Sequence, residues 1–210
     1  MAGNKWSDHP LELYSERLKT IRWFLENHPD RIDLYGPGWN PPPLRKYSDA
    51  LRYVCSSVPL SFLRGKPRFS KTRFLSWLHY PFFRGIAASK QETLREYRFC
   101  ICYENARNIP GYITEKIFDC FLAGVVPVYW GWEGVSTLIP PATFIDRTQF
   151  ESHEELFDFL DSMDAPVYNR YLASIDSFLG SDACALFSNE NYVGTIIKEM
   201  LGASPLQSST

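Results

Sequence analysis

The sequence lacks the features that mark a membrane-spanning, secreted or metal-binding protein. Its apolar runs all fall short of the roughly 20 residues that a membrane-spanning helix needs. Its first residues contain no apolar run, so we expect no signal peptide. The 4 histidines are scattered, and none of the 5 cysteines pairs with them at a zinc-binding spacing. We therefore expect neither a metal site nor a membrane span.

A strong overall charge is also missing. The 22 basic and 24 acidic residues leave a net charge of −2, which gives no reason to expect nucleic acid as a partner. Residues 41–90 depart from this balance, because their only acid is Asp49. The interpretations that stay open for this stretch are contact with a phosphate-bearing ligand, an anionic glycolipid or a membrane surface, or a solvated basic loop. Its basic residues are Arg45, Lys46, Arg52, Arg64, Lys66, Arg68, Lys71, Arg73, Arg84 and Lys90.

The cysteines favour free thiols over a disulfide framework. Their number is odd, and Cys100 and Cys102 stand two apart in a strand-like run, where both would face the same side of a sheet. Buried free thiols are typical of proteins from a reducing compartment. We expect such a compartment here.

The order of predicted elements indicates an α/β fold. Strands alternate with helices from residue 31 onward, which predicts a Rossmann-like parallel sheet with helices on both faces. We expect one domain over residues 1–201, with an irregular basic connection at 41–88 and a disordered tail at 202–210. The predicted helices span residues 11–27, 91–97, 115–123, 154–163, 168–179 and 191–201, and the predicted strands span 32–35, 98–103, 125–130 and 144–146.

Three local signals set the ends of these elements. Gly124 is placed to end the helix at 115–123. Ser152 and Glu155 form a capping-box pattern before the helix at 154–163. Pro127 weakens the prediction of a strand at 125–130, because proline cannot donate a ladder hydrogen bond.

The segment from Glu104 to Lys116 combines several groups that suit a nucleotide sugar. It leaves the carboxyl end of a predicted strand, where parallel sheets bind ligands. Thr114 is a natural N-cap, and the first turn of the following helix favours a phosphate. Lys116 adds a positive charge there, while Glu115 and Tyr112 offer an acceptor and a flat face for hydroxyls and a ring. Plain helix capping explains Thr114 and Glu115 equally well, so on the residues alone both interpretations stay open.

The sequence YRFCICYEN at residues 97–105 is followed by GYITEKI at 111–117 and VPVYWG at 126–131. In this order and spacing the three motifs resemble the signature of the α1,3/4-fucosyltransferase family. PPATFI at 140–145 and IDLYG at 32–36 resemble further segments of that family. The resemblance is strong from about residue 89 to residue 163, with Tyr103 in place of the usual phenylalanine.

The resemblance implies the fold and the donor site. Members of the family have two Rossmann-like domains facing a cleft, the GT-B arrangement, and the carboxyl-terminal domain binds GDP-fucose. This chain is similar to that half. By the same resemblance Tyr112, Thr114, Glu115 and Lys116 bind the donor, with Glu115 toward the ribose and Lys116 toward the diphosphate.

Further donor contacts are implied outside the central motif. Glu104 and Asn105 match a glutamate and an asparagine expected to line the pocket near fucose. An arginine before the IDLYG-like strand is expected to hold the diphosphate. Arg17 is the first candidate and Arg22 the second, since no strict motif fixes the alignment there.

The reaction implied is inverting transfer of fucose to a hydroxyl of a glycan or glycolipid, with an α1,3 linkage. Lys116, Arg17 and the helix terminus would stabilise the charge on the departing diphosphate. The general base is not identified from the sequence. There is no Asp-x-Asp motif, so we expect no required cofactor, with stimulation by a divalent ion left open.

The predicted domain organisation leaves room for alternatives. Too few residues precede the strand at 32–35 to form an acceptor-binding domain, so we expect the donor half alone. The alternatives are a non-catalytic module that binds a GDP-sugar and needs a partner domain, and a related transferase that uses another nucleotide sugar. The expected location is cytoplasmic or peripheral to a membrane, or the Golgi for a eukaryotic fragment separated from its anchor.

Overall fold

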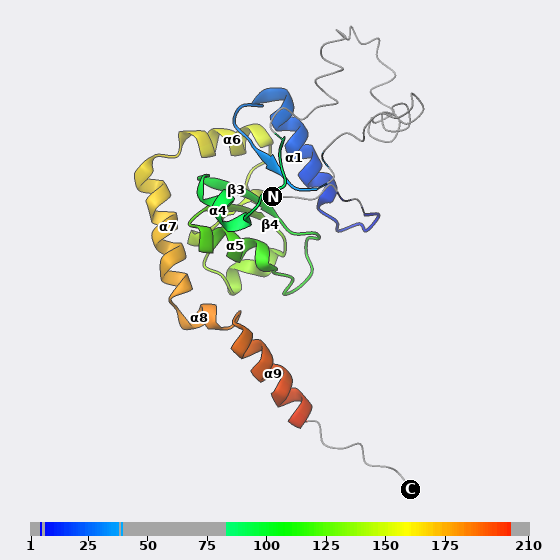
Figure 1. Ribbon diagram of the computed structural model, residues 1–210, viewed down its shortest axis with the longest axis vertical. Coiled ribbons are helices and arrows are strands. Elements are labelled where there is room, and N and C mark those ends of the chain that lie inside the picture. Colours follow the sequence, from blue (N-terminus) through cyan, green and yellow to red (C-terminus); the bar gives the residue numbers. More distant parts are fainter. Residues whose placement is uncertain (1–4, 6, 38, 40–82, 203–210) are drawn as a thin grey trace. The chain divides into compact units, whose positions relative to one another are not determined.

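The computed structural model describes residues 5, 7–37, 39 and 83–202 (Figure 1). These residues fall into two compact units, Met1–Ser89 and Lys90–Thr210. Most of the basic stretch at 41–90 and the tail at 203–210 lie outside the described residues. The single domain predicted over residues 1–201 therefore stays a prediction.

The first unit joins one helix to a small parallel sheet. Helix α1 spans Tyr14–Asn27, and strands β1 (Leu34–Tyr35) and β2 (Phe83–Gly85) pair in parallel, with Leu34 opposite Phe83. Ile21 of α1 packs with Leu34 and Trp39 in a buried cluster. The apolar stripe predicted for the helix thus faces the strand that follows it, as an amphipathic helix requires.

The second unit contains a three-stranded parallel sheet. Strands β3 (Phe99–Tyr103), β4 (Val126–Trp130) and β5 (Ile145–Asp146) lie in the order β3-β4-β5, with Tyr103 opposite Trp130 and Tyr129 opposite Asp146. Val126, Val128 and Tyr129 of the central strand are buried. Continuous burial along a strand is typical of parallel sheets covered by helices, and the predicted parallel sheet with helices is confirmed.

Pro127 fits into the central strand because its backbone is directed away from β3, the strand that pairs with β4 along its whole length. The N–H of Val126 donates to Arg98, and the carbonyl of Trp130 accepts from the N–H of Glu104. Residues 126, 128 and 130 therefore bond to β3, so the backbone of Pro127 is directed toward β5. Strand β5 pairs only with Val128 and Tyr129. The missing N–H of proline consequently costs no ladder hydrogen bond.

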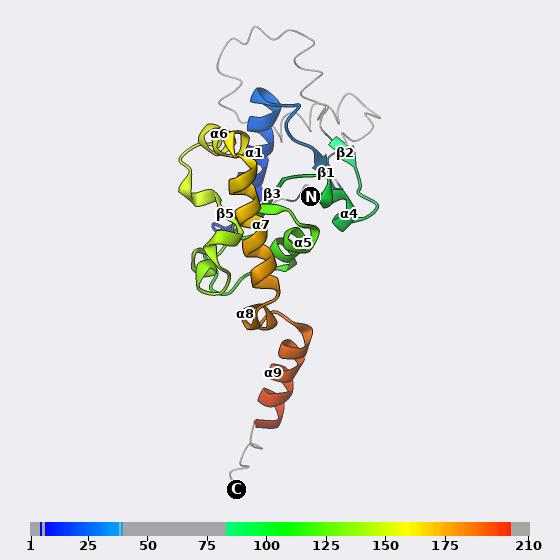
Figure 2. The same ribbon diagram turned by 90° about the vertical axis from the view of Figure 1, so that its left-hand side faces the viewer.

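Helices surround this sheet. Helix α4 spans Lys90–Arg95, α5 spans Glu115–Ala123, α6 spans His153–Ser162 and α7 spans Ala165–Leu179. Phe121 of α5 meets Phe178 of α7 edge to face, with ring centroids 6.0 Å apart. The two views of the ribbon show α5 and α7 beside the sheet (Figures 1 and 2). The remaining elements are the short helices η2 (Glu133–Thr137), η3 (Pro141–Thr143), η4 (Arg147–Gln149) and α8 (Asp182–Ala185), and the last helix α9 (Asn189–Gly202).

Side-chain caps explain where α6 and α7 begin. The hydroxyl of Ser152 accepts from the N–H of Glu155, as predicted, but the carboxylate of Glu155 reaches the N–H of Glu151, one residue before the cap. Helix α7 begins three residues earlier than predicted, because Asp164 caps it and a proline occupies its first turn.

The cysteines in the described part of the chain agree with the prediction of free thiols. Cys100, Cys102, Cys120 and Cys184 are free, while Cys55 lies outside the described residues. Among the helices of residues 5–39 and 83–202, none combines the length and hydropathy needed to cross a bilayer.

We expect Gly124→Ala to lower the free energy of unfolding by about 1–2 kcal/mol, because Gly124 ends α5 in the left-handed conformation, with φ +71°. A β-carbon there would meet no atom within 4 Å, so the cost is one of backbone conformation. Urea unfolding of the full chain measures it. Gly194→Ala, in the open interior of α9, is the matched control and should not lower stability; equal losses for both variants would contradict the explanation.

Candidate functional site

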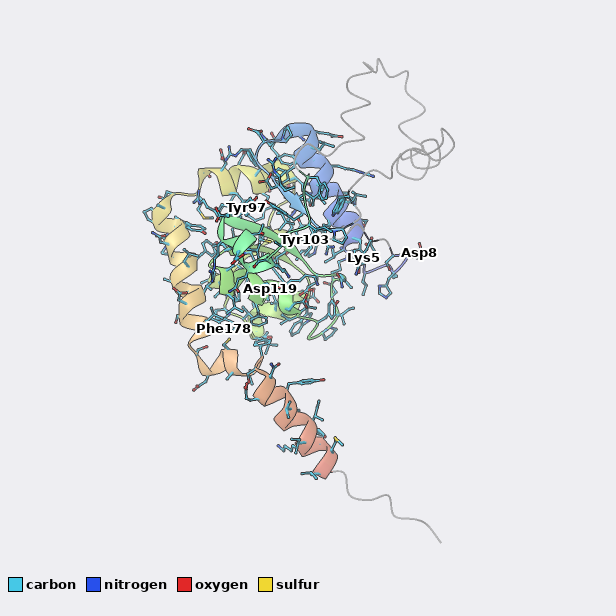
Figure 3. All side chains as sticks on the ribbon, viewed as in Figure 1. Lys5, Asp8, Tyr97, Tyr103, Asp119 and Phe178 are labelled. Atoms are coloured by element: carbon cyan, nitrogen blue, oxygen red, sulfur yellow. The ribbon has the colours of Figure 1, made fainter. Side chains whose placement is uncertain are left out.

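The site begins where strand β3 ends. Tyr103, labelled in Figure 3, is the last residue of β3, and Glu104 follows it directly. The N–H of Glu104 donates to the carbonyl of Trp130 at 2.8 Å, which extends the pairing with β4 by one residue. Glu104 is therefore fixed to the carboxyl edge of the sheet, the edge at which parallel sheets bind ligands.

Glu104 is a buried carboxylate with three hydrogen-bond donors. Its side chain has no exposed surface. Oε1 accepts from the backbone N–H of Thr114 at 2.9 Å, and Oε2 accepts from the hydroxyl of Thr114 at 2.7 Å and from Nζ of Lys116 at 2.8 Å. A buried charge is stable only when it is paired and hydrogen-bonded, and these contacts meet both conditions.

Thr114 does not have the role predicted for its side chain. It stands at the N-cap position of α5 with an extended backbone, but its side chain makes no capping hydrogen bond. Its hydroxyl donates to Glu104 instead. The first turn of α5 therefore receives no acceptor from Thr114, and its N–H groups remain the kind of donors that bind anions at helix N-termini.

Lys116 completes this cluster, which we call the Glu104–Thr114–Lys116 cluster. Its ammonium group donates to Oε2 of Glu104 and, at 3.0 Å, to the hydroxyl of Thr114. Its side chain is 22% exposed, so part of it is in contact with solvent, while the carboxylate that it binds is fully buried. Glu115 is exposed beside it in the same helical turn.

The loop that leads to α5 carries two further predicted residues. Nδ2 of Asn105 donates to the hydroxyl of Tyr112 at 3.3 Å, and both side chains are partly exposed. Gly111, with φ +71°, turns the chain immediately before Tyr112, a conformation that favours glycine. The loop is tied to β4 by the N–H of Asn108, which donates to the carbonyl of Gly131 at 3.2 Å.

Comparison with known proteins identifies this part of the chain. Residues 81–179 match the model of glycosyltransferase family 10 (fucosyltransferase), C-terminal domain. We call residues 81–179, the part of the chain that matches this model, the family 10 domain. They include β3, the loop, α5 and the rest of the sheet, so the Glu104–Thr114–Lys116 cluster lies within the family 10 domain.

Individual relatives agree with this assignment. The chain is 35% identical over 72 residues to alpha-(1,3)-fucosyltransferase FucT of Helicobacter pylori, covering 34% of this chain and 15% of that protein. It is 41% identical over 88 residues to alpha-(1,3)-fucosyltransferase 7 of Bos taurus, covering 39% of this chain and 25% of that protein. The chain thus spans a quarter or less of the curated relatives it matches.

A solved structure of an α1,3-fucosyltransferase with GDP-fucose is also similar. The similarity covers 80% of this chain and 49% of that one, with 20% sequence identity and a TM-score of 0.41.

Arg17 and Arg22, the predicted diphosphate ligands, lie on α1 in the first unit of the chain. The guanidinium of Arg17 lies 5.4 Å from the centre of the Tyr14 ring. Their part in the donor site stays a prediction. Among the residues that the structure describes, no group of three or more histidine, cysteine or acidic side chains is arranged to hold a metal ion.

Three residues of the family 10 domain escaped the sequence analysis. Gly131 is one, because a β-carbon there would overlap with the hydroxyl of Tyr129 and lie 2.8 Å from Cγ of Glu104. Tyr129 is another, since its buried hydroxyl has no hydrogen-bond partner among the described residues. The glycine after a buried strand was the available signal for Gly131, and the polar hydroxyl in an apolar strand was the signal for Tyr129.

Arg147 is the third. It follows β5 and is 7% exposed, with Nη1 donating to the carbonyl of Phe150 at 2.7 Å. Its guanidinium lies 5.7 Å from the centre of the Trp130 ring, a cation–π contact. No sequence pattern separates such a buried arginine from an exposed one.

The buried Tyr129 hydroxyl predicts a loss of stability in alkali. Burial raises the pKa of Tyr129 above its ordinary value, and the Glu104 carboxylate raises it further. The unfolded chain ionises this phenol near its ordinary pKa of about 10 while the folded chain keeps it neutral, so stability present below that pH is lost as the pH rises above it.

We therefore expect the free energy of unfolding to fall less steeply above about pH 10 for Tyr129→Phe than for the unaltered chain. Near neutral pH the substitution should change stability by less than about 1 kcal/mol, because it removes a hydroxyl that has no hydrogen-bond partner in the described part of the chain. Urea unfolding at a series of pH values measures both. Tyr192→Phe, at an exposed position of α9, is the control and should keep the original slope; identical slopes for all three proteins would refute the assignment.

Proposed function

We propose that this chain is the donor-binding half of a fucosyltransferase that moves fucose from GDP-fucose to a hydroxyl of a glycan or glycolipid, with inversion and an α1,3 linkage. The single observation that carries the proposal is Lys116, held at the first turn of α5 within the family 10 domain. The names of the relatives, alpha-(1,3)- and alpha-(1,4)-fucosyltransferases, support the reaction.

The donor diphosphate would bind at the amino-terminal end of α5. The backbone N–H groups of the first turn and the positive end of the helix dipole favour an anion there. Lys116 adds a full positive charge, and its partly exposed side chain is accessible to a ligand. Glu115, exposed in the same turn, is the proposed acceptor for ribose hydroxyls, and the Asn105–Tyr112 pair is proposed to line the sugar end.

In the proposed reaction the acceptor oxygen attacks the anomeric carbon of fucose while the bond from that carbon to the diphosphate oxygen breaks. The bonding electron pair leaves with GDP, and the proton of the acceptor hydroxyl passes to a carboxylate base. Negative charge therefore grows on the diphosphate in the transition state. Lys116 and the helix terminus stabilise that charge, with each well-placed donor contributing about 2.7–4 kcal/mol by analogy with oxyanion holes.

The base is proposed to come from an acceptor-binding half outside this domain. Glu104 is a poor candidate, since it is fully buried and its oxygens accept hydrogen bonds from Thr114 and Lys116. A general base must reach the proton that it removes. The contact between Glu104 and fucose implied by the family resemblance also stays a prediction.

We expect GDP binding to be weakened at least tenfold by Lys116→Ala, which corresponds to about 1.4 kcal/mol, because the substitution removes the charge closest to the proposed diphosphate. Isothermal titration calorimetry with the full chain measures it. Lys198→Ala removes an exposed lysine from α9 and serves as the matched control, with no change expected. The proposal fails if folded, unaltered chain does not bind GDP, or if both lysine variants bind it equally well.

The alternatives make different predictions in the same experiment. A transferase for another nucleotide sugar would bind a different nucleoside diphosphate, such as UDP, more tightly than GDP. A non-catalytic GDP-sugar-binding module would bind GDP but would transfer no fucose when supplied with an acceptor-binding half and an acceptor.

Because cationic groups are proposed to neutralise the leaving diphosphate, we expect the affinity for GDP to be the same in EDTA as in millimolar Mg²⁺. Calorimetric titrations in the two buffers compare them directly, with the ionic strength matched because exposed charges are screened by salt. A tenfold tighter affinity in Mg²⁺ would mean that a metal ion holds the diphosphate and would contradict this part of the proposal.

A further inference from the structure

One carboxylate in the second unit holds together two segments that are separate in sequence. Glu104 lies at the start of the loop and Thr114 at its end, and both the N–H and the hydroxyl of Thr114 donate to Glu104. Lys116, in the first turn of α5, donates to the same carboxylate. The loop between them is thus closed by side-chain contacts at its base, directly beside the end of the helix.

Glu104 is itself held by the sheet. Its backbone N–H bonds to Trp130 of the central strand, and its Cγ packs so closely on Gly131 that no β-carbon fits between them. The backbone of Glu104 is therefore fixed by the sheet, and its side chain is enclosed between Gly131 and Thr114. The sheet fixes the position of Glu104, and hydrogen bonds of 2.7–3.0 Å among Glu104, Thr114 and Lys116 fix the position of Lys116 in turn.

The hydrogen bonds of Lys116 leave one of its N–H donors for a ligand. A lysine ammonium has three N–H donors and no acceptor. Two of them are directed at Oε2 of Glu104 and the hydroxyl of Thr114. Glu104 is fully buried while the Lys116 side chain is 22% exposed, so solvent reaches part of the Lys116 side chain but not Glu104.

We propose that Glu104 is a positioning residue of the donor site: it holds Lys116 in place, with help from Thr114, so that one N–H of the ammonium group points outward to a phosphate oxygen of GDP. A free lysine side chain loses much rotamer freedom when it binds a phosphate. Holding it in its bound position beforehand reduces that cost, which is the advantage of preorganisation. The inference rests on the proposed function, because GDP is taken as the ligand.

The opposite role for Glu104 is competition with the phosphate for Lys116. A negative carboxylate beside an anion site opposes binding by charge repulsion. The burial of Glu104 beneath Lys116 favours positioning, because the ligand approaches from the exposed side and need not displace the carboxylate. The two roles predict opposite changes in GDP affinity when the charge of Glu104 is removed.

A double-mutant cycle tests the proposal on the full chain. GDP binding is measured by calorimetry for the unaltered chain, Glu104→Gln, Lys116→Met and the double variant. We expect Glu104→Gln to weaken binding about tenfold when Lys116 is present and less than twofold when Lys116→Met is already in place, because Glu104 acts through Lys116. Circular dichroism and urea unfolding check that each variant is folded.

Several outcomes would overturn the proposal. Equal weakening in both backgrounds would mean that Glu104 supports only the fold, tighter binding would mean that it competes with the ligand, and no change would mean that Lys116 needs no support. If the unaltered chain binds no GDP, the proposed function fails and this inference with it. If it binds GDP in a Lys116-dependent way but the cycle shows no coupling, only the positioning role fails.

Thr114 provides a second test that leaves the buried carboxylate unchanged. Thr114→Val keeps the shape of the side chain and removes the hydroxyl that donates to Glu104 and accepts from Lys116. We expect it to weaken GDP binding severalfold in the presence of Lys116, and Thr114→Ser, which restores the hydroxyl, to recover most of the affinity. If Glu104→Gln does not fold, the comparison of Thr114→Val with Thr114→Ser tests the positioning role instead. Equal affinities of these two variants for GDP would overturn the proposal.

Discussion

The arrangement of the candidate site depends on one buried carboxylate. Glu104 has no exposed surface, yet it bears a charge at the carboxyl edge of a parallel sheet. Such a charge must find donors, and it finds them in the backbone and hydroxyl of Thr114 and the ammonium group of Lys116. The end of the loop, the start of α5 and the direction of Lys116 all follow from these bonds. Gly131 completes the arrangement, because any larger residue there would occupy the space of Glu104 and Tyr129.

Much of the fold could be predicted from the sequence because its signals are local. Helix α5 has the predicted bounds, since Gly124 can end a helix in the left-handed conformation and the apolar spacing before it is helical. The strands β3 and β4 were recognisable as apolar runs, and their parallel pairing follows from the helix between them. The beginning of α7 was predicted too late, because the apolar pattern alone does not mark the first turn, which the Asp164 cap sets.

The contacts of the site could not be predicted in the same way, because they join residues that are distant in sequence. Thr114 has the sequence position of an N-cap, and only the structure shows that its hydroxyl turns to Glu104 instead. Pro127 argued against a strand until the register showed that its backbone is directed away from β3. The buried position of Arg147 on the Trp130 ring has no local signal at all. The family resemblance assigned Tyr112, Thr114, Glu115 and Lys116 to a donor site, which stays a prediction, and it gave no account of how these residues hold one another.

The central claim is that Lys116 is presented to the donor diphosphate while Glu104 continues to hold it. A crystal structure of the chain with GDP tests this most directly. The account predicts a phosphate oxygen within about 3 Å of Nζ of Lys116, near the first turn of α5, with the bonds from Thr114 and Lys116 to Glu104 unchanged. A diphosphate bound elsewhere, or a Lys116 side chain that leaves Glu104 to reach it, would contradict the account.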